Sequence, residues 1–367
     1  YDLASMTKPL ATTLSLMKLY EQQKFNLEQT VGDFFDIEGI DTTGKDTIRM
    51  KNILTHQSQL HSWIPFYQYL VKDFFNSEKA YLFSPRKSSL YPHKLNNSLY
   101  IRHDYSFVDS SISRKPSQLY SVPVSDSVYI TKAYHDTIFN MIFQSPLYEK
   151  KDVIYSDLGF YLLPEIIQKI SNKRIDHFVY SHFYSSIGAD RLCYNPLFQF
   201  SKDEIAPTEH DYIFRQQTVH GYVHDPGAAM LGGISGHAGL FSNSNDVAKI
   251  CQMLINEGTY GNTRYLQPET ISLFTSCPFC KEGNRKGYGF DKADVNPYKL
   301  DPTCKCTSPQ SYGHSGFTGT IFWVDPKYDI IYVFLSNRVY PDANNPKLGR
   351  MNIRPRIQQV IYDAITE

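Results

Sequence analysis

The chain has 367 residues, of which 41% are hydrophobic, and its 37 basic side chains balance its 37 acidic ones. This length predicts two or three domains, or one large fold in two parts. Zero net charge excludes the basic excess of a protein whose main partner is nucleic acid. The longest apolar runs, such as 330–335, are strand-sized and far below the roughly 18–20 residues of a membrane span, which excludes an integral helical membrane protein.

Apolar periodicity predicts the elements along the chain. A helix follows a short extended entry within residues 1–24, with Pro9 in its first turn. The segment 62–150 is poor in glycine and has no repeat, and we expect a long insertion there, part loop and part helix. Five glycines between 226 and 241 predict a close backbone approach. Further helices are expected at 48–60, 158–171, about 244–257 and about 352–366, and a β-hairpin from the runs 319–324 and 330–336.

Ser5 and Lys8 form the first motif with chemistry suited to catalysis. At the start of a helix, residues i and i+3 share a face, so the hydroxyl and the ammonium can meet. A lysine with a lowered pKa can activate a serine as a nucleophile. The same Ser-x-x-Lys pattern recurs at Ser15–Lys18 and Ser84–Lys87, so the pattern alone identifies no site.

Two further runs carry candidate groups. Tyr155 stands in Tyr155-Ser156-Asp157 before a predicted helix and could act as a general base beside a lysine; the alternative is a plain helix cap. His314-Ser315-Gly316 opens a β-rich stretch whose N–H groups could stabilise an oxyanion; the alternative is an ordinary strand start. Neither run identifies a site by itself.

The order of the three motifs resembles that of the penicillin-recognising serine hydrolases. Three flanking runs resemble segments of the class C β-lactamase and esterase family: 54–60, 236–242 and 313–319. Three others look more like the serine-hydrolase domain fused behind family 3 glycoside hydrolases (β-N-acetylglucosaminidase-like) in Bacteroidetes-type envelope proteins: 155–163, 223–233 and 336–341. This second resemblance implies an exported protein, in the periplasm or associated with the outer membrane, with a fused glycoside hydrolase upstream.

The resemblance implies an α/β (α+β) fold, in which an antiparallel sheet flanked by helices joins a mostly helical domain, with the active site between them. Residues 1–50 and 240–367 would form the sheet-containing domain, and 51–239 the mostly helical one. The insertion at about 62–150 would supply pocket walls. The family normally has strands before its Ser-x-x-Lys helix, so we expect an incomplete sheet with an unpaired edge.

The resemblance also assigns roles to individual residues. Ser5 would be the nucleophile, Lys8 its base partner and Tyr155 the second acid/base group. The N–H groups of Ser5 and Phe317 would form the oxyanion hole. The residues that would bind substrate or support the site are Asp157, His314, Ser315 and Gly316. The family's usual lysine and asparagine are replaced here by His314 and Asp157. A neutral histidine attracts a substrate carboxylate less than lysine does, and Asp157 could pair with Lys8 and make it a poorer base.

These departures argue against efficient penicillin hydrolysis. We therefore expect a serine hydrolase that forms an acyl-enzyme on an amide or ester, such as a peptidoglycan-derived D-amino-acid peptide, and that needs no cofactor. The alternative from another class is a non-catalytic module that binds cell-wall peptides or serves as an accessory to the glycosidase.

Four of the six cysteines form a paired pattern, with Cys277 and Cys280 in C-x₂-C and Cys304 and Cys306 in C-x-C. Three states stay open for this set: disulfides, a tetrahedral zinc site, or free thiols. The other two, Cys193 and Cys251, are expected to be small buried hydrophobic side chains.

Overall fold

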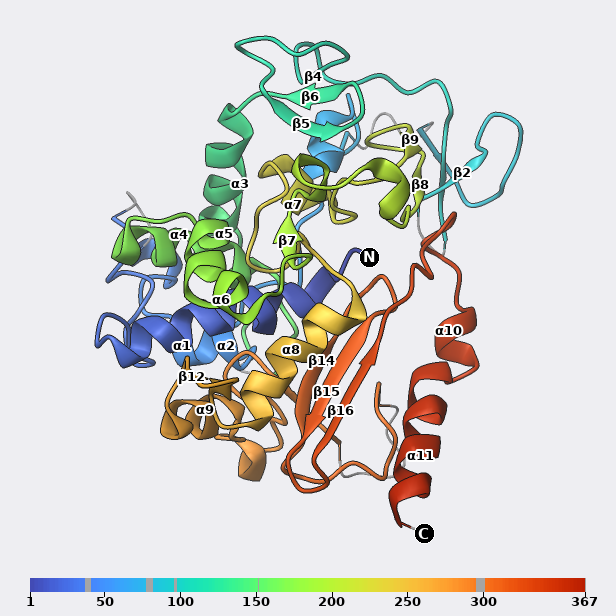
Figure 1. The fold of residues 1–367 in the computed structure, drawn as a ribbon. Coiled ribbons are helices and arrows are strands. Elements are labelled where there is room, and N and C mark those ends of the chain that lie inside the picture. Colours follow the sequence, from blue (N-terminus) through green and yellow to red (C-terminus); the bar gives the residue numbers. More distant parts are fainter. Residues whose placement is uncertain (37–40, 77–81, 96–97, 151, 295–300, 367) are drawn as a thin grey trace.

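The computed structural model describes residues 1–36, 41–76, 82–95, 98–150, 152–294 and 301–366. An antiparallel sheet near the C-terminus stands beside a larger, mainly helical part (Figure 1). The helices are α1 (Leu14–Glu21), α2 (Met50–Leu54), α3 (Ala133–Gln144), α4 (Leu158–Ser171), α5 (Ile175–Val179), α6 (Ser185–Ile187), α7 (Pro226–Met230), α8 (Ser244–Ile255), α9 (Pro268–Thr275), α10 (Lys347–Arg350) and α11 (Ile353–Thr366).

The strands are β1 (Phe83–Ser84), β2 (His93–Lys94), β3 (Tyr100–Ile101), β4 (Ile112–Ser113), β5 (Val122–Ser125), β6 (Val128–Ile130), β7 (Cys193–Tyr194), β8 (His210–Asp211), β9 (Gln217–Thr218), β10 (Leu240–Phe241), β11 (Thr259–Tyr260), β12 (Thr263–Arg264), β13 (Asp291–Lys292), β14 (Tyr312–Ser315), β15 (Ile321–Asp325) and β16 (Ile330–Phe334). The main sheet has the order β13-β14-β15-β16, with every neighbouring pair antiparallel. Strands β15 and β16 form the hairpin expected from the sequence.

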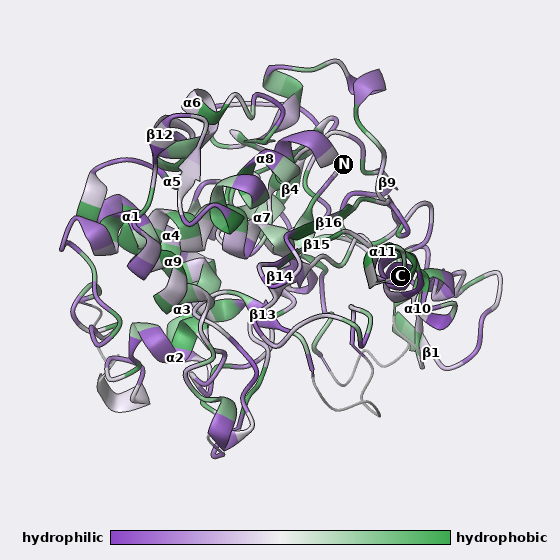
Figure 2. Cartoon of the chain, turned by 60° about the horizontal axis from the view of Figure 1, so that its bottom comes forward, coloured by the Kyte–Doolittle hydropathy of each residue, from purple (hydrophilic) through white to green (hydrophobic). Residues whose placement is uncertain are grey.

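The two faces of the main sheet are covered by different helices. Phe322 and Val324 of β15 belong to the large core, which also includes the apolar side of α8. The alternate residue Trp323 faces the opposite side with Tyr332, whose hydroxyl donates to the Arg354 carbonyl of α11. This period of two buries both faces of the strands, and apolar residues make up most of β15 and β16 (Figure 2).

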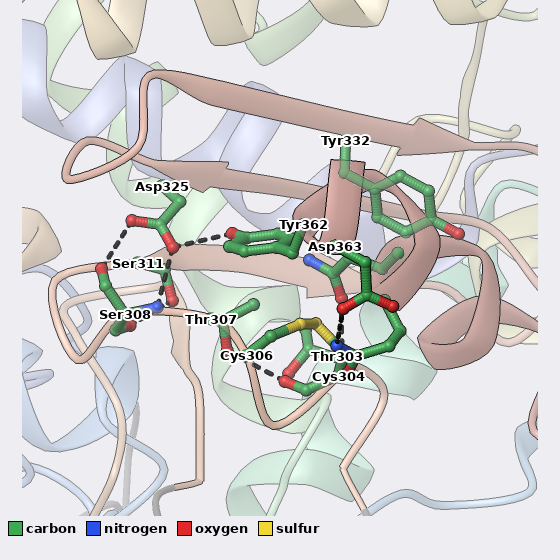
Figure 3. Close-up of a disulfide and its surroundings, with 12 residues drawn as sticks. Thr303, Cys304, Cys306, Thr307, Ser308, Ser311, Asp325, Tyr332, Tyr362 and Asp363 are labelled. Atoms are coloured by element: carbon green, nitrogen blue, oxygen red, sulfur yellow. Dashed lines mark hydrogen bonds between the residues drawn. A yellow bond between two sulfur atoms is a disulfide. The ribbon is translucent and has the colours of Figure 1, made fainter. Parts of the chain in front are cut away.

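A buried carboxylate joins the sheet to α11 (Figure 3). Asp325, at the end of β15, accepts hydrogen bonds from the Ser308 hydroxyl at 2.5 Å and from the Tyr362 hydroxyl at 2.7 Å. The Cys304–Cys306 disulfide lies beside this cluster. The segment after residue 301 is thereby held against both the sheet and the last helix.

Several expected elements differ from those observed. Helix α2 ends at Leu54 rather than near 60, because His56 and Gln59 adopt left-handed backbone conformations, with φ of 56° and 61°. The insertion contains α3 as expected, but it also contains the six short strands β1–β6, whose alternation is too brief to register in the sequence. Helix α9 was not expected either.

Two expectations about the architecture stay predictions. The division into a 1–50 plus 240–367 domain and a 51–239 domain is not tested by the fold alone. Among the described residues, β16 pairs only with β15, so this side of the sheet is an edge. Edge strands offer unpaired N–H and C=O groups, and the expected additional strands would fit there.

Candidate active site

Ser5 stands at the start of a continuous run of helical turns that extends from Ala4 to Glu21. Ala4 adopts a left-handed conformation, with φ of 48°, which costs roughly 1–2 kcal/mol for a residue with a Cβ atom. The buried Asp2 carboxylate holds this turn, because it accepts hydrogen bonds from the N–H groups of Ala4 at 2.7 Å and His224 at 2.6 Å. The position of Ser5 is therefore set by its N-terminal neighbours.

Lys8 is fully buried and lies between two oxygen atoms. Its Nζ atom donates to Ser5 Oγ at 3.0 Å and to Asp157 Oδ1 at 2.6 Å. Burial favours the neutral amine, but the Asp157 carboxylate and the Tyr155 hydroxyl outweigh it and raise the pKa of Lys8 above its usual value. The pairing expected between Asp157 and Lys8 is present, and it keeps Lys8 a cation at neutral pH.

Tyr155 completes this cluster from the segment before α4. Lys8 Nζ lies 4.8 Å from the centre of the Tyr155 ring, and the ring packs on His56 with centroids 4.4 Å apart. Desolvation raises the pKa of the Tyr155 hydroxyl, although the charge of Lys8 and hydrogen bonds to Lys8 and Ser5 act to lower it. The one ring thus contacts both the helical turn and the turn after α2.

The end of β14 packs tightly against the segment that carries Ser5. A Cβ atom at Gly316 would lie 2.4 Å from the Leu3 carbonyl oxygen, so only glycine fits there. The Thr318 and Thr320 hydroxyls donate to the carbonyls of Asp2 and Leu3, at 2.7 and 3.0 Å. The first residues of the chain are therefore bound to the segment that follows β14.

A cavity of about 1170 Å³ opens at this junction. Its wall includes Ser5, Tyr155, Asp157, Ser315, Gly316 and Phe317. The insertion supplies further wall residues, as expected, including Trp63, Tyr67, Lys87, His93 and Tyr100. Six of the eight predicted site residues thus line one cavity. Lys8 contacts Ser5 from a buried position, and the His314 ring lies 6.1 Å from the Tyr155 ring, centroid to centroid.

His314 is buried and its Nδ1–H donates to the Ser315 carbonyl at 2.7 Å. Burial is the largest effect on its pKa and lowers it to about 4, with Lys8 and Lys286 acting in the same direction and Asp291 against them. His314, which stands where the family usually has a lysine, is therefore uncharged at neutral pH.

This lowered pKa predicts a pH dependence of stability. The unfolded chain protonates His314 near its ordinary pKa of about 6.5, whereas the folded chain protonates it only near 4. The unfolded state thus binds more protons between these values, and we expect the free energy of unfolding to fall by up to about 3 kcal/mol as pH drops through this window. Urea unfolding of the wild type and of His314→Gln at pH 7 and pH 4.5 measures it.

The His314→Gln variant should have a smaller fall in stability between the two pH values. His177→Gln serves as the control, because the His177 side chain is 73% exposed. An identical fall in the wild type and His314→Gln would contradict the prediction.

The structure pairs the four motif cysteines as two local disulfides, Cys277–Cys280 and Cys304–Cys306. Of the three states left open for these cysteines, the structure therefore has the disulfides and neither a zinc site nor free thiols. In the described ranges no group of three or more His, Cys, Asp or Glu side chains could hold a metal ion. Cys251 is buried as expected, and Cys193 is only partly buried.

Sequence reasoning missed three groups around the site. Asp2 holds the turn before Ser5, and Asp225 Oδ1 accepts a hydrogen bond from His237 Nε2 at 2.8 Å in the cavity wall. The third is Lys286, whose Nζ atom lies 5.3 Å from the centre of the Tyr155 ring. The resemblance of the run 236–242 to family segments was the one available signal for His237; Asp2 and Lys286 stand outside any motif.

Comparisons with known proteins identify the family of the chain. The Beta-lactamase family model matches residues 1–351. A Salmonella agona protein named "Putative D-alanyl-D-alanine carboxypeptidase" is 30% identical over 367 residues, which cover 95% of this chain and 72% of the relative.

Two solved structures are similar in fold. The penicillin-binding protein from Bacillus halodurans has a TM-score of 0.57 at 12% identity, covering 96% of this chain and 86% of that one. EstCE1, described as a hydrolase with promiscuous acyltransferase activity, has a TM-score of 0.55 at 17% identity, covering 96% and 84%. None of the helices in the described residues is long and apolar enough to span a membrane. The chain belongs to the β-lactamase family and is a serine hydrolase whose fold is similar to that of a penicillin-binding protein.

Proposed function

We propose that the protein hydrolyses an amide or ester through an acyl-enzyme on Ser5, and that its substrate is a peptide ending in D-alanine or a related ester. The observation that carries the proposal is the contact of Ser5 Oγ with Lys8 Nζ at 3.0 Å, beside Tyr155 and open to the cavity. A serine needs such neighbours to become a nucleophile.

Tyr155, rather than Lys8, is assigned as the proton acceptor, and it acts in its phenolate form. Desolvation makes the phenolate the minor form at neutral pH, while the charge of Lys8 and the hydrogen bonds to Lys8 and Ser5 stabilise it. Lys8 is held as a cation by Asp157 and cannot take up a second proton. Ser5 Oγ would attack the carbonyl carbon while its proton passes to the Tyr155 phenolate, and the N–H groups of Ser5 and Phe317 would hold the oxyanion. Tyr155 would return the proton to the leaving amine or alcohol, and then accept a proton from the water that releases the acyl group.

We propose the D-alanyl peptide because the Salmonella relative is named a putative D-alanyl-D-alanine carboxypeptidase. We propose the ester because EstCE1 is described as a hydrolase with promiscuous acyltransferase activity. A β-lactam is a poorer candidate, since the neutral His314 offers its carboxylate no cation. The two disulfides favour an oxidising compartment, which supports an exported location at the cell envelope. A fused family 3 glycoside hydrolase stays a prediction.

Reaction with a fluorophosphonate, followed by intact-mass spectrometry, tests the proposal. We expect one adduct on the wild type and none on Ser5→Ala, together with faster hydrolysis of an acyl-D-Ala-D-Ala peptide than of its L-Ala-L-Ala isomer. A folded wild-type protein without an adduct would contradict catalysis and leave the non-catalytic binding module.

A further inference from the structure

The electrostatic surroundings of Tyr155 include a cation from an unexpected part of the chain. Strand β14 offers the neutral His314 where a lysine was expected. Lys286, from the loop between α9 and β13, has its Nζ atom 5.3 Å from the centre of the Tyr155 ring, and Lys8 Nζ lies at 4.8 Å. Two ammonium groups thus stand near a single ring.

The loop that carries Lys286 is firmly attached. The buried Asn284 side chain donates to the Thr55 carbonyl at 3.0 Å, and the Gly289 N–H donates to the Leu54 carbonyl at 2.9 Å. Arg285 Nε donates to the Ala293 carbonyl at 2.7 Å. These bonds fix the loop to the turn after α2 and to the end of β13, on both sides of Lys286.

The Lys286 side chain itself is also fixed. Its ammonium is ion-paired with Asp291 of β13 and its side chain is 21% exposed. Lys286 is not among the residues that line the cavity, so its ammonium contacts the Tyr155 ring without forming part of the cavity wall. Its charge reaches the neighbouring rings, because it acts to lower the pKa of both His56 and His314.

We propose that Lys286 is a positioning residue that stabilises the Tyr155 phenolate. The proposal rests on the proposed function, in which Tyr155 accepts the Ser5 proton. The charged and titratable groups that face Tyr155 are Lys8, Asp157, His56, His314 and the Lys286–Asp291 pair. Since the two histidines are held neutral, Lys8 and Lys286 are the cations of this set.

The rate of Ser5 acylation by a fluorophosphonate between pH 6 and 10 tests the proposal. We expect Ser5 of the Lys286→Met variant to be acylated about tenfold more slowly than in the wild type at pH 7. The rise of the acylation rate with pH should move by about one pH unit to higher pH, which corresponds to a tenfold decrease in the acid constant of Tyr155. Lys286→Arg should restore most of the rate. Lys281→Met, an exposed lysine of the same loop, is the matched control and should behave as the wild type.

The partner Asp291 distinguishes an electrostatic role from a structural one. Asp291→Asn removes the opposing negative charge, so the rise in rate should shift to lower pH, opposite to Lys286→Met. A merely structural ion pair would slow both variants alike at every pH, and this result, or profiles identical to the wild type, would overturn the proposal. A wild type that is not labelled at Ser5 would instead overturn the proposed function.

Discussion

Tyr155→Phe is expected to lower the rate of Ser5 acylation by about 10³-fold, within the range of 10²–10⁴ for loss of a general base. The substitution removes the phenolic oxygen that, as phenolate, would accept the Ser5 proton, but it keeps the ring that packs on His56 at 4.4 Å. Lys8 is already protonated and cannot replace it. Second-order rates with a fluorophosphonate, measured beside the thermal unfolding midpoint, separate lost chemistry from lost folding.

Tyr148→Phe is the matched control for this experiment. Tyr148 is 38% exposed against 37% for Tyr155, and its ring also stacks on a histidine, His61, with centroids 4.3 Å apart. It lies outside the cavity wall, so its variant should keep the wild-type rate. Acylation of Tyr155→Phe within tenfold of the wild type would exclude Tyr155 as the proton acceptor.

Asp157→Ala is expected to lower the free energy of unfolding by about 3–5 kcal/mol, the usual effect of leaving one partner of a buried ion pair uncompensated. Lys8 has no exposed surface on its side chain, and Asp157 stands 2.6 Å from its Nζ atom. Urea unfolding at pH 7 measures the change.

Glu28→Ala gives the matched comparison. Glu28 also pairs with a lysine, Lys51, at 2.6 Å, but it is 62% exposed, so its loss should change stability by less than about 1 kcal/mol. If both variants lowered the free energy of unfolding by the same amount, burial of Lys8 would not increase the contribution of its carboxylate partner to stability.

The sequence allowed prediction of the residues near the cavity because they stand in short motifs with fixed spacing. Ser5 and Lys8 share one helical face, and Tyr155 and Asp157 flank the start of α4, so local geometry already orients them. The hairpin β15–β16 and helices α4, α8 and α11 followed from apolar periodicity for the same reason.

What the sequence could not reveal depends on contacts between distant segments. Lys286 stands outside any motif, and the hydrogen bonds of Asn284 and Gly289 to Thr55 and Leu54 hold its loop near Tyr155. The proton-acceptor role considered for Lys8 changes for a similar reason: its pKa depends on Asp157, which is 149 residues away. The two-residue strands of the insertion carry too little alternation to be recognised.

The hydrogen bonds from Thr318 and Thr320 to Asp2 and Leu3 join residues that are more than 300 positions apart. Contacts of such long range are costly in chain entropy and slow the folding of a chain. The nucleophile and the strand end beside it are therefore brought together by tertiary folding and not by local structure. A partly folded or truncated chain in which these two segments are apart would not react at Ser5 with a fluorophosphonate. Covalent labelling of Ser5 therefore reports that the segments have come together, as well as the chemistry of the site.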